Sequence, residues 1–369
     1  MTTFFTGGPW VTRFAPSPTG TVHLGNVRTA IINALLARKT GGQFLLRLED
    51  TDQERSRFAF EAALLWSLSW LGLVPDQPVR HQSLRLSLYH QAVARLYASG
   101  AAYPCFCSEH ELEQERKRTA AAGLPPRYSG KCATLSAEQG AQRIQAGEAH
   151  VMRFRAPQER NVEFHDLIKG PITVPTSAFG DFVLLRSSGW PSYNLAVVVD
   201  DMDMGVTLVL RGEDHLTNTA RQILLYEALG APVPSFAHHG LVLDREGKKL
   251  SKRSGALGIP DCMQRGLEPL AVVHYLASLS GALPTKKLYE NLDDMARDFI
   301  PAALGRGSAV MSLDELEHLS TRYFRAARVQ DMCQRLCELV PASDPWHGLD
   351  AAWQEEVVVQ LRENASTSG

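Results

Sequence analysis

The sequence predicts an α/β fold in which a parallel sheet carries an α+β insertion and is followed by an all-helical C-terminal part. Three observations favour it. Strand and helix signals alternate over residues 11–72, mixed signals occupy residues 81–186, and helical patterns dominate beyond Gly258. A chain of 369 residues is long enough for two or three domains.

The first elements are predicted from the residues before position 72. A β-prone run over 11–15 enters a segment of two prolines and a glycine, residues 16–20, which can continue neither a strand nor a helix. A glycine pair then turns the chain into a strand over 43–48, and a helix follows from about Phe58. A β-α-β unit with parallel strands is the simplest arrangement. The helix between the strands is predicted from apolar residues three or four apart: Val27, Ala30, Ile31, Ala34, Leu35 and Ala37.

The middle of the chain shows mixed helix and strand signals instead of a regular alternation. Residues 81–186 combine a helix over 84–99, a cysteine-containing segment and short β-like runs such as 150–155. Because alternating strand and helix signals stand on both sides of it, this region is predicted to be an insertion between two halves of the parallel-sheet domain.

The second half of that domain is predicted from residues after 187. Strand-like apolar runs return over 192–210, interrupted by the acidic run Asp200–Asp203, and a helix over 216–229 and a strand with a loop over 240–252 follow. Four parts are therefore expected: the first half-domain in 1–80, the insertion in 81–186, the second half-domain with a lysine-rich loop in 187–255, and a helical region in 256–369.

The composition is that of a soluble globular protein, with 44% hydrophobic and 21% charged residues. Apolar runs such as Leu195–Val199 are too short to span a bilayer, and residues 1–11 lack the charged start of a secretory signal, so a cytoplasmic location away from membranes is expected. The net charge of −2 gives no global basic field for nucleic acid, although local basic stripes suffice for phosphate contacts. Six cysteines in so long a chain do not predict a disulfide framework.

Residues 13–28, RFAPSPTGTVHLGNVR, carry the most informative motif. A strand, a stiff loop and a helix start form a phosphate site, because free backbone N–H groups and the positive end of the helix dipole lie there. His23 and Asn26 lie at the helix entrance, where their side chains could add donors. This arrangement indicates a nucleotide-binding enzyme.

Two further segments place charge where such an enzyme needs it. Gly247–Arg253 has four cations in six positions, which suits a mobile loop closing over polyphosphate, although alone it is typical of a solvated basic turn. Arg47–Asp52 puts carboxylates at the carboxyl end of the second strand, where open α/β sheets bind ligands. Capping of the next helix by Thr51 or Asp52 is an alternative, and both can hold.

Together these segments resemble the signatures of class I glutamyl-tRNA synthetases, and the match runs from about Val11 to Ala256. His23-Leu24-Gly25-Asn26 stands in the place of the family's HIGH quartet, and Lys249–Arg253 occupies the five positions of its KMSKS loop. The resemblance implies a class I Rossmann-like catalytic domain, an acceptor-binding insertion and a helical stem-contact region. It also implies ATP with Mg²⁺, L-glutamate and tRNA as ligands, and a monomer.

The resemblance implies roles for single residues as well. Catalytic stabilisation of charge on the α-phosphate and the departing pyrophosphate falls to His23, Asn26, Lys249 and Lys252. ATP binding involves His23, Gly25, Lys249, Ser251, Lys252 and Arg253. Glutamate binding involves Glu49 at the α-ammonium group, Arg13 and Arg211 at the side-chain carboxylate, and Tyr193 and Ser17 as polar contacts. An arginine pocket should reject glutamine, because a neutral amide leaves the cations unmatched.

The insertion carries two further candidate sites. Cys105-x-Cys107 and Tyr128-x3-Cys132 resemble a zinc site found in some members of the wider family, with three free buried cysteines as the alternative and Glu109 or His110 as substitute ligands. A basic cluster resembles the surface that holds the tRNA acceptor end, although a solvated helix face explains its first three members equally well. Its residues are Arg116, Lys117, Arg118, Arg127 and Lys131.

Past Arg253 the resemblance thins, and about half of the expected length follows, so the anticodon-binding domain is expected to be missing or reduced to a remnant over 329–361. Three interpretations remain. The first is a shortened glutamyl-tRNA synthetase acting on tRNA(Glu). The second is a relative that glutamylates a queuosine base in tRNA(Asp), which the cysteine spacing favours, and the third is an idle paralogue that binds RNA or protein. The long insertion on the Tyr128 side and the 100-odd residues after the lysine loop argue against the second, and intact signature residues argue against the third, so the first is favoured.

Overall fold

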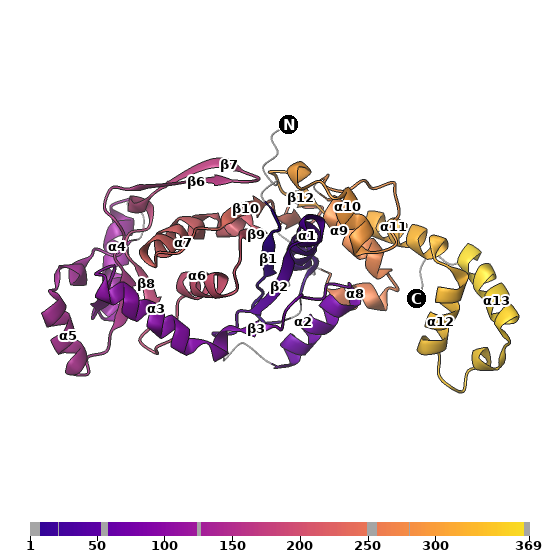
Figure 1. Ribbon diagram of the computed structural model, residues 1–369, viewed down its shortest axis with the longest axis horizontal. Coiled ribbons are helices and arrows are strands. Elements are labelled where there is room, and N and C mark those ends of the chain that lie inside the picture. The colour runs from indigo at the N-terminus through magenta and orange to yellow at the C-terminus, as the bar shows by residue number, and fades with distance from the viewer. Residues whose placement is uncertain are drawn as a thin grey trace. The chain divides into compact units, whose positions relative to one another are not determined.

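The computed structural model describes residues 8–20, 22–52, 58–123, 127–248, 257–279 and 281–364, with only the backbone of Leu339 and Asn364. These residues form two compact units. The first unit lies within Met1–Thr19, Thr40–Phe58 and Pro75–Gly240, and the second within Gly20–Lys39, Ala59–Val74 and Leu241–Gly369. Figure 1 follows the elements from the indigo N-terminus to the yellow C-terminus.

The first unit contains the predicted parallel sheet. Its strands are β1 (Val11–Phe14), β2 (Gln43–Leu48), β3 (Arg80–His81), β6 (Asn161–Asp166), β7 (Gly170–Pro175), β9 (Leu208–Gly212) and β10 (Ser235–His239). β2 pairs in parallel with β1 and β3, and β10 pairs in parallel with β9 and β6. The Thr207 N–H donates to the Val11 carbonyl oxygen at 3.0 Å, so β1 and β9 begin side by side and join the two groups.

Residues after β3 add an antiparallel sheet and three helices, and β6 and β7 form a long hairpin (Figure 1). The sheet has the order β4-β5-β8, formed by Ala102–Cys105, Val151–Phe154 and Phe182–Leu185. The helices are α3 (Leu86–Ala98), α4 (Glu109–Ala121) and α5 (Ala137–Gln145). α4 and α5 begin at capping boxes, in which Ser108 and Ser136 hydroxyls accept backbone N–H groups three residues on.

The strand predicted over residues 192–199 is wrong, because this segment forms helix α6 (Tyr193–Asp203). Its apolar run is buried on every side, and a short buried run has no periodicity that separates a strand from a helix. The helix is stabilised from outside the segment, since Asp200 and Asp201 pair with arginines that precede them by more than a hundred residues. The helix predicted over 216–229 is confirmed as α7 (Leu216–Ala228).

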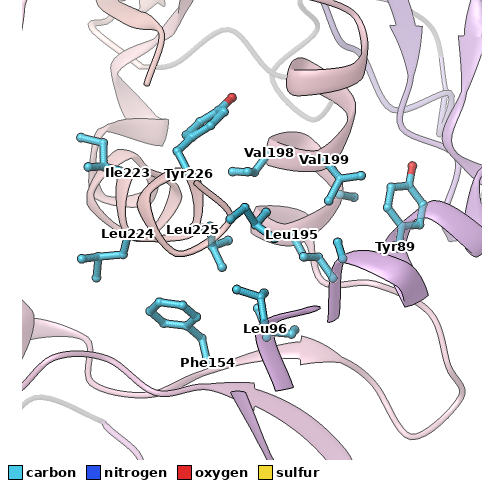
Figure 2. Close-up of a cluster of buried hydrophobic side chains, with 14 of the residues drawn as sticks. Tyr89, Leu96, Phe154, Leu195, Val198, Val199, Ile223, Leu224, Leu225 and Tyr226 are labelled. Atoms are coloured by element: carbon cyan, nitrogen blue, oxygen red, sulfur yellow. The ribbon is translucent and has the colours of Figure 1, made fainter. Parts of the chain in front are cut away.

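α6 and α7 pack against each other over a continuous apolar core (Figure 2). Leu195 and Val198 of α6 face Leu225 of α7, while Leu96 and Phe154 close the cluster from α3 and β5. Burying one such side chain stabilises the fold by about 1.5 to 3 kcal/mol. This core fixes the two helices whose polar residues reach the carboxyl edge of the parallel sheet.

In its described residues, the second unit is helical apart from two short strands, as predicted for the C-terminal part. Its apolar helix α1 (Leu24–Thr40) has the predicted buried face, and Lys39 Nζ donates to the Arg297 carbonyl oxygen at 2.9 Å. β11 (Val242–Leu243) pairs in parallel with β12 (Ala309–Val310). The other helices are α2 (Phe58–Trp70), α8 (Ile259–Gln264), α9 (Pro269–Ser278), α10 (Leu292–Asp298), α11 (Leu313–Ala326), α12 (Val329–Leu339) and α13 (Ala351–Asn364). In the described part of the chain, no helix combines the length and hydrophobicity needed to cross a membrane.

Candidate active site

Polar side chains gather where the parallel strands of the first unit end. Arg13 stands near the end of β1, Glu49 directly follows β2, and Arg211 stands near the end of β9. Carboxyl ends of parallel strands are the usual ligand-binding edge of an open α/β sheet. The structure thus brings together three of the residues predicted to bind the amino acid.

Arg13 is held by a carboxylate on α6. Its Nε donates to both Asp201 oxygens, at 3.1 and 3.2 Å, and Arg47 also pairs with Asp201. All three side chains are buried. Burial raises the pKa of Asp201, but Arg13 and Arg47 outweigh it, so this pKa lies below its usual value. Sequence reasoning missed the roles of Asp201 and Arg47, because a long-range ion pair leaves no local pattern.

The neighbouring Asp200 ties α6 to α3. It accepts hydrogen bonds from Gln82 Nε2 at 2.7 Å, Arg85 Nε at 2.7 Å and Tyr89 Oη at 2.9 Å. Since Asp200 is fully buried, all of these donors are needed to replace its lost hydration. The acidic run of α6 therefore anchors the helix and orients Arg13 at the same time.

Glu49 lies beside these cations. Its N–H donates to the Pro16 carbonyl oxygen at 3.0 Å, which fixes the residue against the loop after β1. Its Oε1 accepts a hydrogen bond from Arg47 Nη2 at 3.4 Å. Burial raises the pKa of Glu49, while Arg47 and Arg13 oppose the rise. A carboxylate held in this way can bind an ammonium group. Ser17, by contrast, is exposed, and its carbonyl oxygen accepts the Thr19 N–H at 2.8 Å.

Arg211 is a buried cation with 5% of its surface exposed. Its side-chain bonds run from Nε to His238 Nε2 (3.1 Å), from Nη2 to Thr219 Oγ1 (2.9 Å), Gln222 Oε1 (2.8 Å) and the His215 carbonyl oxygen (3.4 Å), and from Nη1 to Tyr193 Oη (3.5 Å). Every described partner is uncharged. Burial therefore lowers the pKa of Arg211. A buried guanidinium with neutral partners favours an anionic ligand.

Tyr193 and His215 cover the outer side of this arginine. Tyr193 Oη lies 3.1 Å from His215 Nδ1, and their ring centroids are 5.4 Å apart. Burial, followed by the charge of Arg211, lowers the pKa of His215 to about 4. The ring is therefore neutral near pH 7 and adds no charge beside Arg211.

The residues predicted to bind ATP lie in the second unit as far as they are described. His23 forms an isolated bridge with Gly258 directly before α1, and its Nδ1 accepts the Asn26 N–H at 3.4 Å. A Cβ atom on Gly25 would lie 3.1 Å from the His23 ring, so glycine lets this ring fold back on the helix start. Lys249, Ser251, Lys252 and Arg253 lie outside the described residues.

The predicted zinc ligands form one cluster. The Sγ atoms of Cys105, Cys107 and Cys132 all lie within 4.8 Å of one another, and Cys107 Sγ is 3.6 Å from Cys132 Sγ. Tyr128 Oη is 3.4 Å from Cys105 Sγ and 3.3 Å from Cys107 Sγ. Tetrahedral zinc with bonds of about 2.3 Å requires sulfurs about 3.8 Å apart, so the donor set fits. Glu109 and His110, the alternative zinc ligands, are exposed residues at the start of α4.

The basic cluster of the insertion is exposed throughout, and acidic neighbours compensate part of it. Arg116 and Lys117 both pair with Glu113 on α4, at 3.5 and 3.8 Å. Lys131 pairs with Glu111 at 2.7 Å. A solvated helix face therefore accounts for these charges without a nucleic-acid partner.

A family model described as the catalytic domain of class I tRNA synthetases (E and Q) matches residues 10–315. The chain belongs to this family. Its sequence is 43% identical over 323 residues to a glutamate–tRNA ligase of Desulfitobacterium hafniense, across 85% of this chain and 66% of that protein. It is 44% identical over 362 residues to glutamate–tRNA ligase 2 of Alkalilimnicola ehrlichii, across 94% of this chain and 75% of that protein.

A solved synthetase structure agrees with the fold. The crystal structure of a glutamate tRNA ligase from Elizabethkingia meningosepticum in complex with its amino acid matches with a TM-score of 0.85 at 29% identity, covering 97% of this chain and 77% of that one. The predicted α/β class with a Rossmann-like catalytic domain is thereby confirmed. The chain matches about two thirds of the length of the Desulfitobacterium hafniense protein.

Proposed function

We propose that this chain is a glutamate–tRNA ligase that activates L-glutamate with ATP and transfers it to the 3′ end of tRNA(Glu). The observation that carries the amino-acid choice is buried Arg211, whose described partners are all neutral. The side-chain carboxylate of glutamate supplies the missing negative charge. Relatives named as glutamate–tRNA ligases support the reaction.

The pocket holds the two ends of glutamate through opposite charges. Glu49 binds the α-ammonium group, while Arg211 and Tyr193 receive the side-chain carboxylate, with Arg13 adding a second cation nearby. Glutamine presents a neutral amide and would leave buried Arg211 without a negative partner, a loss of about 2 to 5 kcal/mol. Discrimination against glutamine thus follows from charge.

In the reaction, an α-carboxylate oxygen of glutamate attacks the α-phosphorus of ATP and displaces pyrophosphate. A ribose hydroxyl at the tRNA end then attacks the acyl carbon and releases AMP. Neither step needs a protein nucleophile, so the chain contributes orientation and charge stabilisation.

His23, Gly25 and Asn26 at the start of α1 are the described part of the ATP site, and the lysine-rich loop with Lys249 and Lys252 is its proposed counterpart. Mg²⁺ would accompany ATP and shield the phosphate charges.

Zinc is proposed as a structural ion at the sulfur cluster. Cys105, Cys107, Cys132 and Tyr128 would complete four ligands. The Arg153 Cζ atom lies 4.1 Å from the centroid of the Tyr128 ring and packs over that ligand. The ion would tie the start of α4 to the segment around residue 132, within the insertion proposed to hold the acceptor end of tRNA.

The same cluster favours a second candidate function, because its Cys-x-Cys…Tyr-x3-Cys spacing resembles that of the queuosine-modifying relatives. In that case the acceptor is a modified base in tRNA(Asp). Labelled glutamate, supplied with ATP and either tRNA(Glu) or tRNA(Asp), separates the two. Prior periodate oxidation destroys the terminal ribose diol. A ligase labels only unoxidised tRNA(Glu), whereas label on a base of tRNA(Asp) would contradict the first proposal.

A further inference from the structure

Arg211 is held from its inner side by a buried histidine and aspartate. His238 on β10 accepts the Arg211 Nε–H through Nε2 at 3.1 Å, and its Nδ1 lies 2.6 Å from Asp166 Oδ2. His238 and Asp166 have no exposed surface. The three side chains come from β9, β10 and β6, which are neighbours in the sheet. Asp166, His238 and Arg211 therefore form a line of hydrogen-bonded side chains that ends at the proposed amino-acid pocket.

The partners of His238 determine which ring nitrogen carries its proton. Arg211 Nε can only donate, so Nε2 must be an unprotonated acceptor. The Asp166 carboxylate can only accept, so Nδ1 must carry the hydrogen. Charged groups facing the ring are Asp166, Arg211 and Arg13, and burial lowers the pKa of His238 against the pull of Asp166. The ring is thus neutral, with one defined tautomer.

Backbone groups fix Asp166 in turn. Its Oδ1 accepts N–H groups from Ile168 at 3.0 Å, Lys169 at 2.8 Å and His238 at 3.2 Å. These three bonds hold the carboxylate so that only Oδ2 faces the imidazole. The turn between β6 and β7 therefore sets the direction of the whole line.

We infer that Asp166 and His238 are positioning residues that orient Arg211 for the ligand carboxylate, an inference that rests on the proposed function. His238 engages Nε, and Thr219 and Gln222 engage Nη2, so Nη1 is left toward Tyr193. The ligand carboxylate then meets Arg211 Nη1 and the Tyr193 hydroxyl together. Without the acceptor at His238, Nε loses its partner, and the guanidinium is held only through its bonds at Nη1 and Nη2, so it can rotate away from this direction more readily.

Asp166→Asn tests the tautomer without changing size. The three backbone N–H groups keep the amide oxygen on their side, so the amide NH₂ faces His238 Nδ1 as a donor. His238 must then move its proton to Nε2, where it opposes the Arg211 Nε–H. Two donors face each other, and Arg211 loses its inner support.

Steady-state kinetics with tRNA(Glu) give the first readout. Asp166→Asn is expected to raise the glutamate KM about 10- to 100-fold while leaving the ATP KM unchanged. His238→Gln is expected to act more weakly, because its amide oxygen can still accept from Arg211. Glu163→Gln is the matched control, since Glu163 is exposed on the same strand, β6. Thermal unfolding of each variant reports folding separately.

Two further measurements separate this inference from the proposed function. In ¹⁵N NMR of histidine-labelled protein, the His238 signal, identified by its loss in His238→Gln, is expected as Nδ1–H in the wild type and Nε2–H in Asp166→Asn. A wild-type proton on Nε2 would overturn the inference. So would an Asp166→Asn effect on the glutamate KM that is equally large in the His238→Gln background. A wild type that never uses glutamate would instead overturn the proposed function and the role in glutamate binding with it, while the NMR result still tests the line itself.

Discussion

Replacing Arg211 with alanine removes the charge on which the glutamate assignment depends. The guanidinium is 5% exposed and makes five hydrogen bonds to described groups, none of them to a carboxylate. Its loss affects two quantities, the stability of the first unit and the binding of the ligand carboxylate. These quantities are expected to change by different amounts, so they can be told apart.

The effect on stability is partly compensated. The variant leaves Gln222 Oε1 buried without the Arg211 donor, at about 1 to 3 kcal/mol, whereas His238 Nε2 keeps the Thr219 hydroxyl at 3.2 Å. Removal of a cation whose pKa is already lowered by burial offsets part of this loss. The effect on binding is larger, because Arg13 is already bonded to Asp201 and the ligand carboxylate loses its main charged partner, at about 3 to 5 kcal/mol. This corresponds to about a 10²- to 10⁴-fold loss in kcat/KM for glutamate.

Pyrophosphate exchange in the presence of tRNA(Glu) measures kcat/KM for glutamate. A titration with ATP in the same assay measures the KM for ATP. Arg160→Ala is the matched control, because Arg160 is a half-exposed arginine of the same unit that pairs with Glu227 at 2.7 and 2.8 Å. The control should retain full activity. A folded Arg211→Ala protein whose glutamate kcat/KM stays within about tenfold of the wild type would refute the pocket assignment.

Three other changes have defined outcomes. Asp201→Asn leaves two buried arginines without their shared charge, so urea denaturation should show a loss of about 3 to 5 kcal/mol in the free energy of unfolding; an unchanged midpoint would contradict this. His215, whose folded pKa is about 4, stays neutral while the unfolded chain takes up a proton below pH 6.5 or so. Its contribution to stability is therefore complete above about pH 6.5 and falls toward pH 4 by roughly 2 to 3 kcal/mol, a slope that His215→Gln should lack in denaturation at several pH values. Cys132→Ser should lower the zinc content of purified protein well below one ion per chain, measured by atomic emission, whereas exposed Cys337→Ser should leave it unchanged; equal zinc in both would argue against the site.

The sequence predicts well those strands and helices whose signals are local. The strand over 43–48 agrees with β2 to the residue, and the helix expected from about Phe58 is confirmed as α2 over its described residues. Glycine pairs, prolines and apolar spacing are local signals, so they need no knowledge of the rest of the chain. The helix α6 could not be predicted in the same way, because its carboxylates are satisfied by arginines far away in the sequence.

The site shows the same division between local and long-range information. Arg13, Glu49 and Arg211 were found because each lies in a recognisable motif at a strand end. The supports behind them were missed, since Asp166, His238 and Asp201 meet their partners only in the folded sheet. One signal was available for His238, which follows the apolar residues of β10 and is therefore a polar residue at the end of a buried strand.

The central claim is tested most directly by glutamate-dependent ATP–pyrophosphate exchange with and without tRNA(Glu). By its resemblance to glutamyl-tRNA synthetases, the chain is expected to exchange only when tRNA(Glu) is present. Exchange without tRNA would contradict this account and favour the queuosine-modifying reaction. Absence of exchange under both conditions, from a folded protein, would contradict glutamate activation itself.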